Sequence, residues 1–360
     1  MNNQIIIKQD HFNNFDKLLH KVKFTNCLII TSNGNIERGY EKPFIDLLKK
    51  NKCNFVIHKI NNYPTLLDIE IMFNHLRDHN VDLVISIGGG SSIDIAKIYS
   101  SCKLKEDSLT DISQLLNSNS SDCIMSIAVP TTAGSGAEST KFATIWSKES
   151  KEKLSFENDN LIPDYVYLIP EYTASLSYDL TLTTTLDSLC HGIDSLLNKN
   201  SNDESIKLSI EAISLISDNL RLLMDDLENL KLRKCILTAS NLSGKAINIT
   251  RTSLNHAISY PLTNYYGLPH GLACAFSVIN TVEFFKEEIL KLSYGKNLIK
   301  ASETIKSLPL SKFYKKYLEE LDIELIAKNT INNSRYENFR FELNSNIIKE
   351  IIHKSKLYYI

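Results

Sequence analysis

Glycine is scarce in this 360-residue chain, and neither a disulfide pattern nor a long apolar run is present. The 12 glycines are about half of the ~7% that is usual, so a cluster of them marks a place where the backbone needs glycine. The 7 cysteines are odd in number, widely spread and never in a CxxC arrangement. This excludes a secreted disulfide framework and predicts reduced thiols in a cytoplasmic protein.

An excess of charge of one sign is also missing. Lys and Arg number 40, and Asp and Glu number 42, which leaves a net charge of −2. No basic stripe is visible, so we expect no nucleic-acid partner. No apolar run approaches the ~18–20 residues that cross a bilayer, and no signal-peptide pattern is recognised. We therefore expect a soluble protein without a membrane segment.

The pattern of apolar residues differs between the two halves of the chain. The first 170 residues alternate short β-branched runs with amphipathic stretches, whereas from residue 182 on apolar residues recur at helical spacing. The predicted strands are 27–31, 54–58, 81–87, 124–129 and 165–168, and the predicted helices between them include 43–50 and 67–79. We predict an α/β domain with a parallel sheet over 1–172 and an all-α domain over 173–360.

Three of the scarce glycines directly follow one predicted strand. Gly88, Gly89 and Gly90 let the backbone approach an anion closely, because no Cβ is in the way. The amides of Ser91 and Ser92 then open a helix, whose dipole favours phosphate. The motif is neither GxGxxG nor a Walker A sequence, and a tight turn without a ligand would have the same pattern.

A second polar turn, PTTAGSG, follows the next predicted strand. Thr131, Thr132 and Ser135 supply hydroxyl groups, and the two glycines of the turn permit unusual backbone angles. Both turns are expected at the C-terminal ends of parallel strands, where open α/β sheets bind ligands. The pair therefore predicts a dinucleotide site.

One acid and three histidines in the second half form a candidate metal site. Asp187 and His191 are four residues apart, so on a helix they project from one face. Prolines between His256 and His270 prevent one straight helix, so we expect these two at a helix end and at the start of the next helix. One carboxylate and three imidazoles suit Fe²⁺, Zn²⁺, Mn²⁺ or Co²⁺ with an open position for substrate. A lone histidine is more often an ordinary core or surface residue.

In four motifs the chain resembles the iron-containing (group III) alcohol dehydrogenase family. GGGSxxDxAK, PTTAGSGxE, DxxxH and H–x13–H–G occur in this order and spacing, and the resemblance covers roughly residues 25 to 285. It implies a dehydroquinate synthase-like fold, with a dinucleotide-binding α/β domain and a helical metal-binding and substrate domain. It also implies the cofactors NAD(P)H and a divalent metal, with Fe²⁺ foremost.

The resemblance assigns individual residues. The implied metal ligands are Asp187, His191, His256 and His270. The implied cofactor residues are Gly88, Gly89, Gly90, Ser91 and Asp94 in the first motif, Thr131, Thr132 and Ser135 in the second, and Lys153, which would reach the ribose.

Two positions depart from the family pattern. Many members carry a further histidine four residues after the third ligand, where this chain has Tyr260. A tyrosine can donate a proton, as can a water chain or a cofactor hydroxyl. NAD-dependent members often end the first strand with an aspartate that repels a 2′-phosphate. Ser32 takes that position here, so NADPH should be tolerated and could be preferred.

The residues before the third ligand are unusually polar. On a continuous helix Lys245, Asn248 and Thr252 share one face and Arg251 borders it. A solvated polar face is one interpretation. The other is a cationic wall for an anionic substrate, because Arg and Lys bind phosphonates through charge-assisted hydrogen bonds. The run GKAINITRT before HAxSYPLT resembles the phosphonoacetaldehyde reductase branch of the family.

We therefore predict a homodimeric, metal-dependent NAD(P)H reductase of a small anionic aldehyde. The resemblance makes phosphonoacetaldehyde, reduced to 2-hydroxyethylphosphonate, the first candidate substrate. The predicted catalytic and substrate residues are Tyr260, Lys245, Asn248 and Arg251. The alternatives are a reductase of another short aldehyde or a carboxylate-bearing semialdehyde, a non-catalytic binding protein, and a synthase or lyase that recycles NAD.

Overall fold

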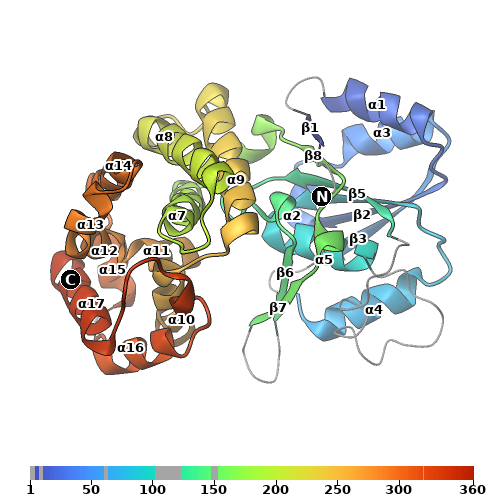
Figure 1. Ribbon diagram of the computed structural model, residues 1–360. Helices are drawn as coiled ribbons and strands as arrows, with labels where there is room; N and C mark the ends of the chain where they lie inside the picture. The colour runs from blue at the N-terminus through green and yellow to red at the C-terminus, as the bar shows by residue number, and fades with distance from the viewer. Residues whose placement is uncertain (1–4, 8–10, 61–63, 102–122, 147–152, 319) are drawn as a thin grey trace. The chain divides into compact units, whose positions relative to one another are not determined.

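The computed structural model describes residues 5–7, 11–60, 64–101, 123–146, 153–318 and 320–360 (Figure 1). The chain divides into two compact units, of which the first comprises Met1–Thr132 and Ala137–Thr173, and the second comprises Ala133–Gly136 and Ala174–Ile360. The short stretch Ala133–Gly136, which lies within the predicted first domain, thus groups with the helical unit.

A six-stranded parallel sheet in the order β1-β8-β5-β4-β2-β3 is the centre of the first unit. The elements of this unit are β1 (Ile5–Ile7), α1 (His11–Lys21), β2 (Asn26–Ser32), α2 (Asn33–Glu37), α3 (Lys42–Lys50), β3 (Asn54–Ile60), α4 (Leu66–Leu76), β4 (Leu83–Gly88), α5 (Gly90–Ser101), β5 (Met125–Pro130), β6 (Phe142–Trp146), β7 (Lys153–Glu157) and β8 (Tyr165–Tyr167). The predicted parallel sheet is confirmed. The sequence analysis did not predict β1 or the antiparallel β6–β7 pair.

Helices cover both faces of this sheet because alternate side chains of its buried strands point to opposite sides. On β2, Leu28 and Ile30 pack in one core with α4 and α5. Cys27 and Ile29 pack in the other core with α1 and α3. Figure 1 shows these helix pairs on opposite sides of the strands. The two cores fix the C-terminal edge of the sheet, where both polar turns emerge.

The second unit is built mainly of helices, as predicted. Its helices are α7 (Tyr178–Leu196), α8 (Asp203–Asp225), α9 (Leu230–Thr250), α10 (Leu254–Tyr266), α11 (His270–Ala275), α12 (Val278–Phe284), α13 (Lys286–Leu290), α14 (Gly295–Lys306), α15 (Ser311–Tyr317), α16 (Ile323–Ile331) and α17 (Ser345–Tyr359). Helix α7 packs against α8, α9 and α11, and from Thr181 to Leu196 nearly every residue is buried. Polar side chains on this helix must therefore find partners inside the protein.

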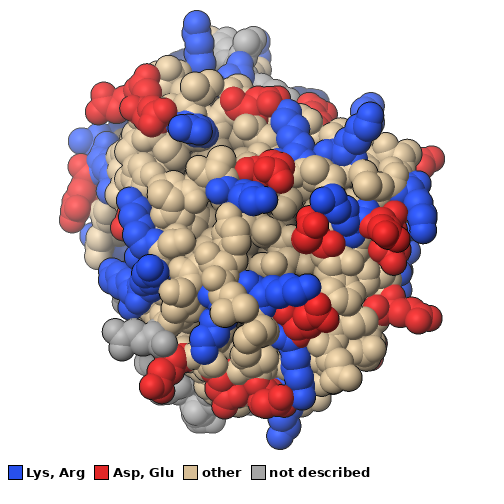
Figure 2. All heavy atoms as spheres, turned by 90° about the vertical axis from the view of Figure 1, so that its left-hand side faces the viewer, with Lys and Arg blue, Asp and Glu red and all other residues tan. Residues whose placement is uncertain are grey.

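The surface carries charges of both signs. On the face shown in Figure 2, Lys and Arg alternate with Asp and Glu between neutral residues, without a continuous basic stripe. In the part of the chain that the structure describes, each helix is too short or too polar to cross a lipid bilayer.

Candidate active site

Helix α7 carries Asp187, His191 and Asp194 on one face, because residues four and seven apart in an α-helix lie one above the other. All three side chains are buried. The Asp–His pair therefore projects from one helix face, as the spacing predicted.

The four predicted metal ligands meet at one carboxylate oxygen. Asp187 Oδ1 lies 3.6 Å from His191 Nε2, 3.5 Å from His256 Nε2 and 3.6 Å from His270 Nε2. Donor atoms around a tetrahedral ion with bonds of about 2.0–2.1 Å are roughly 3.4 Å apart. The distances from Asp187 Oδ1 to the three histidines thus fit a shared divalent metal. Their assignment as ligands stays a prediction.

One side of this cluster is more open than the others. The His270 side chain is 30% exposed, whereas those of His191 and His256 are 7% and 3% exposed. A substrate would therefore approach an ion from the side of His270.

The two predicted ligands outside α7, His256 and His270, lie at the starts of helices. His256 lies in the first turn of α10 and His270 is the first residue of α11. The expectation that one of them lies at a helix end was wrong, because Pro261 falls inside α10 and does not end it. Gly271 makes the position of His270 possible, since a Cβ there would collide with the carbonyl of Thr183 on α7.

Asp194 orients His256, and the sequence analysis missed it. Its Oδ2 is 2.8 Å from His256 Nδ1 and accepts a hydrogen bond from Ser253 N at 2.8 Å. Its Oδ1 accepts a bond from Asn255 Nδ2 at 2.8 Å. A buried carboxylate on one imidazole nitrogen turns the other nitrogen toward a metal. The Nε2 of His256 is buried and has no hydrogen-bond partner among the described residues. The signal was available, because Asp194 continues the Asp187–His191 face by one more turn.

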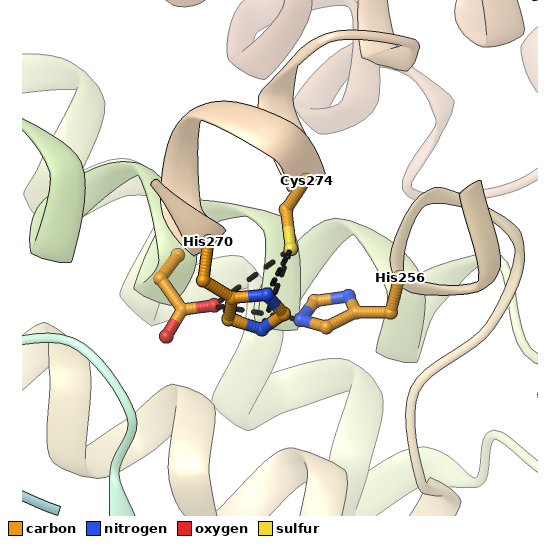
Figure 3. A group of neighbouring side chains, drawn as sticks. His256, His270 and Cys274 are labelled. Carbon is orange, nitrogen blue, oxygen red and sulfur yellow. Dashed lines mark hydrogen bonds and ion pairs between the residues drawn. The ribbon is translucent and has the colours of Figure 1, made fainter. Parts of the chain in front are cut away.

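Cys274 is a second residue that the sequence analysis missed. Its Sγ lies 3.9 Å from Asp187 Oδ1 and 3.7 Å from His270 Nε2. Figure 3 shows Cys274, His256 and His270 pointing toward one another. Donor atoms of Asp187, His256, His270 and Cys274 all lie within 4.8 Å of one another, so a soft sulfur donor borders the site. Its place in the sequence, one helical turn after His270, is the only signal for it.

Burial and the concentration of polar groups shift the pKa values of these residues. Burial alone would raise the pKa of Asp187, but the neighbouring His191 and His270 hold it well below its usual range. Burial lowers the pKa of His191 to about 4. A charged carboxylate beside a neutral imidazole is the protonation state that binds a divalent cation.

The polar residues before His256 do not form one helix face. Helix α9 ends at Thr250, where Asn198 Nδ2 donates to the Thr250 carbonyl at 2.8 Å. Arg251 then takes a left-handed backbone with φ of 64°. The predicted face shared by Lys245, Asn248 and Thr252 is therefore wrong, because Thr252 lies beyond the helix. Lys245 and Asn248 are half-buried on α9, Arg251 is exposed, and Thr252 is buried.

Tyr260 lies near the predicted ligands. It is half-buried on α10, four residues after His256, and its ring centroid is 6.2 Å from that of His270. It therefore borders the more open side of the cluster.

In the first unit, three strand ends lie together at the C-terminal edge of the sheet. Ser32 ends β2 and caps α2, accepting a hydrogen bond from Asn35 N at 3.4 Å. Thr131 N donates to Gly88 O at 3.0 Å, and a Cβ on Gly89 would lie 3.2 Å from Thr132 Oγ1. The two predicted turns thus meet, and the absence of a Cβ at Gly89 lets them approach each other closely at the C-terminal edge of the sheet. This arrangement fits a dinucleotide phosphate.

The remaining cofactor residues are placed differently. Gly90 and Ser91 open α5. Asp94 Oδ2 accepts from Thr144 N at 3.0 Å, which ties α5 to β6. Ser135 belongs to the second unit, and the side chain of Lys153, at the start of β7, lies outside the described residues. The cofactor role of each stays a prediction.

Comparison with known proteins identifies the family. The model of the iron-containing alcohol dehydrogenases matches residues 2–170. The model of the C-terminal part of the Fe-containing alcohol dehydrogenase family matches residues 181–308. The chain belongs to the iron-containing alcohol dehydrogenase family. As a member it is an NAD(P)-dependent oxidoreductase with a divalent metal, which agrees with the acid–histidine cluster on α7, α10 and α11.

Two curated relatives in this family illustrate its range. The chain is 32% identical over 250 residues to phosphonoacetaldehyde reductase from Streptomyces viridochromogenes, a match that covers 67% of this chain and 62% of the relative. The match therefore spans less than two thirds of that relative. Alcohol dehydrogenase 4 from Saccharomyces cerevisiae is 27% identical over 294 residues, which cover 79% of this chain and 77% of the yeast protein.

A solved structure shows the same fold. The sulfoacetaldehyde reductase from Bifidobacterium kashiwanohense, in complex with NAD⁺, superimposes with a TM-score of 0.83 at 20% identity. The alignment covers 98% of this chain and 96% of that one. The predicted combination of an α/β part with a helical part is thereby confirmed.

Proposed function

We propose that this iron-type alcohol dehydrogenase reduces a small anionic aldehyde, with phosphonoacetaldehyde as the substrate and 2-hydroxyethylphosphonate as the product. The polar segment that leads into His256 carries the proposal. Lys245 and Asn248 lie half-buried on α9, and Arg251 follows at its end. A cation on this segment would bind an anionic group one or two carbons from the carbonyl of the aldehyde. The Streptomyces relative is named for this reaction.

The backbone of Arg251 gives independent support. Its φ of 64° and ψ of 179° lie in a region that residues other than glycine rarely occupy. Such a conformation costs on the order of 1–3 kcal/mol and is concentrated at functional sites. An arginine here, where glycine would be less strained, suggests that the side chain is kept for its charge.

Each residue of the site would have a separate role in the reaction. The bound metal would supply a Lewis acid for the carbonyl oxygen, and the nicotinamide would supply the hydride. Asp187, His191, His256 and His270 would hold the metal, and Asp194 would keep the His256 ring in orientation. Tyr260, beside His270, would give its phenolic proton to the product oxygen.

The cofactor would lie on the edge of the sheet in the first unit. The amides that follow Gly89 would hold the pyrophosphate at the start of α5. Ser32 presents no negative charge to a 2′-phosphate, so we propose that NADPH is accepted alongside NADH. A homodimer remains part of this proposal.

Neutralisation of the two cations tests the substrate. Lys245→Gln and Arg251→Gln should each lower kcat/KM for phosphonoacetaldehyde about ten- to a hundredfold, because a charge-assisted hydrogen bond contributes ~1.5–3 kcal/mol. Reduction of propanal, which has no anionic group, should be nearly unchanged. The matched control is Lys207→Gln on the exterior of α8, which should affect neither substrate.

The panel also separates the rival substrates. Succinic semialdehyde, which carries a carboxylate, should be a poorer substrate than phosphonoacetaldehyde. If it were the better one, the enzyme would be a semialdehyde reductase of the same mechanism. If kcat/KM fell equally for charged and neutral aldehydes in both variants, Lys245 and Arg251 would not bind the anionic group of the substrate.

A further inference from the structure

Arg335, between α16 and α17, packs over the ring of Tyr260, which lies beside His270 of the predicted metal site. Its Nε donates to Thr252 Oγ1 at 3.0 Å. Its guanidinium carbon lies 4.9 Å from the ring centroid of Tyr260, and that ring is 6.2 Å from the ring of His270. Thr252 and Tyr260 flank His256 four residues on either side. Residues 83 positions apart in the chain thus place a cation beside the proposed proton donor.

The segment that carries Arg335 is fastened to the helices of the site. Asn338 Nδ2 donates to Thr252 O at 3.0 Å. Lys199 N donates to Asn338 O at 2.9 Å, and Asn198, which also caps α9, forms a β-bridge with Phe339. The guanidinium is therefore positioned before any ligand arrives, so binding would order little more of the chain.

Arg335 differs from the structural arginines of the same unit. Arg233 is buried and directs its guanidinium nitrogens to Leu227 O, Thr181 Oγ1 and Leu176 O. Arg340 donates through Nη2 to Asn198 O and Ser201 Oγ. Arg335 is half-buried, uses only Nε, and has no carboxylate partner among the described residues. Its two terminal nitrogens thus remain available for a bidentate bond to an oxyanion.

We propose that Arg335 binds the anionic group of the aldehyde substrate and sets the preference for charged over neutral aldehydes. This inference rests on the proposed function. The phosphonate would accept hydrogen bonds from Nη1 and Nη2 of Arg335 while the aldehyde carbon faces the predicted metal ligands. The contact with the Tyr260 ring and the bond to Thr252 hold the guanidinium beside the proposed proton donor, so the anion and the proton donor would be held at one site.

Variants at one position, with a control elsewhere, test the role of Arg335. In Arg335→Gln, kcat/KM for phosphonoacetaldehyde should fall about ten- to a hundredfold, mainly through KM. In the same variant kcat/KM for propanal and KM for NADPH should change less than about threefold. The inhibition constant of methylphosphonate should rise by the same factor by which kcat/KM for phosphonoacetaldehyde falls. Arg335→Lys keeps the charge but loses the planar guanidinium. Its kcat/KM for phosphonoacetaldehyde should lie between the values for the unsubstituted protein and for Arg335→Gln. The control is Arg221→Gln, at an exposed position of α8.

The results separate this inference from the proposed function. If the unsubstituted protein reduces phosphonoacetaldehyde no better than propanal, the proposed function fails. If it prefers phosphonoacetaldehyde and Arg335→Gln keeps that preference, Arg335 does not bind the anion and the proposed function stands. Equal losses on both aldehydes, or a rise in KM for NADPH alone, would also overturn the inference, because Arg335 would then support Tyr260 or the cofactor.

Discussion

At the scale of single residues, the site depends on one carboxylate that is not itself a predicted ligand. Asp194 accepts hydrogen bonds from the backbone at the start of α10 and from the His256 ring. The same side chain thus stabilises the helix start and fixes which imidazole nitrogen faces Asp187. Burial alone would raise the pKa of Asp194, but the hydrogen bond from His256 lowers it, so the carboxylate keeps the charge that this double role needs.

Removal of one predicted ligand should abolish tight metal binding, whereas removal of the nearby thiol should not. His256→Ala should weaken the binding of Zn²⁺ or Fe²⁺ by more than ~100-fold, since the loss of an outer partner alone costs ~10–100-fold. Cys274→Ser is the matched control and should keep its metal, because the four predicted ligands remain. The measurements are metal content by mass spectrometry and circular dichroism to verify folding. A loss of metal in Cys274→Ser as complete as in His256→Ala would make sulfur a ligand and contradict the predicted set.

A negative charge at the end of β2 should act against NADPH. Ser32 ends β2 at the C-terminal edge of the sheet, one residue after Thr31, which pairs with Ile87 of β4, and it carries no carboxylate. Ser32→Asp should raise KM for NADPH at least ~tenfold and leave KM for NADH within about threefold, because only NADPH brings a 2′-phosphate. Ser32→Asn is the neutral control. Equal KM changes for the two cofactors would show that Ser32 does not face the ribose.

At the scale of helices and strands, periodicity predicted the elements well and their ends poorly. Strands β2, β3, β4 and β5 follow the predicted runs within about two residues, because continuous apolar runs are typical of a buried parallel sheet. The end of α9 was not predictable from spacing, since it depends on Asn198, 52 residues earlier in the chain. The contact of Arg335 with Thr252 is similarly non-local. Local patterns therefore found the predicted ligands but not the residues that support them.

The approach of α11 to α7 should tolerate no side chain at Gly271. A Cβ there would overlap the Thr183 carbonyl, and backbone atoms cannot move aside as a side-chain end can. Gly271→Ala should lower the free energy of unfolding by about 1–3 kcal/mol and weaken metal binding by displacing His270. Gly34→Ala is the control, because its Cβ would meet only the flexible end of Arg38. Chemical denaturation measures both variants. A Gly271→Ala protein as stable as the parent would show that the helices can separate without cost.

At the scale of the whole molecule, the two units carry different parts of the chemistry. The glycine turn after β4, together with Thr131 and Thr132, belongs to the first unit. Residues Ala133–Gly136 of the second turn, the acid–histidine cluster, Tyr260 and Arg335 belong to the second. Membership of the iron-containing alcohol dehydrogenase family makes the chain an oxidoreductase. The proposed function adds that cationic residues of the second unit select an anionic aldehyde, and this is the central claim.

Product analysis with the metal-loaded protein tests that claim most directly. The protein, NADPH and phosphonoacetaldehyde are incubated together, the loss of NADPH is followed by absorbance, and the product is identified by phosphorus NMR. We predict that 2-hydroxyethylphosphonate appears in equal amount to the NADPH consumed, at a kcat/KM at least ~tenfold above that for propanal. Absence of this product while propanal is reduced, or faster turnover of propanal than of phosphonoacetaldehyde, would contradict the account.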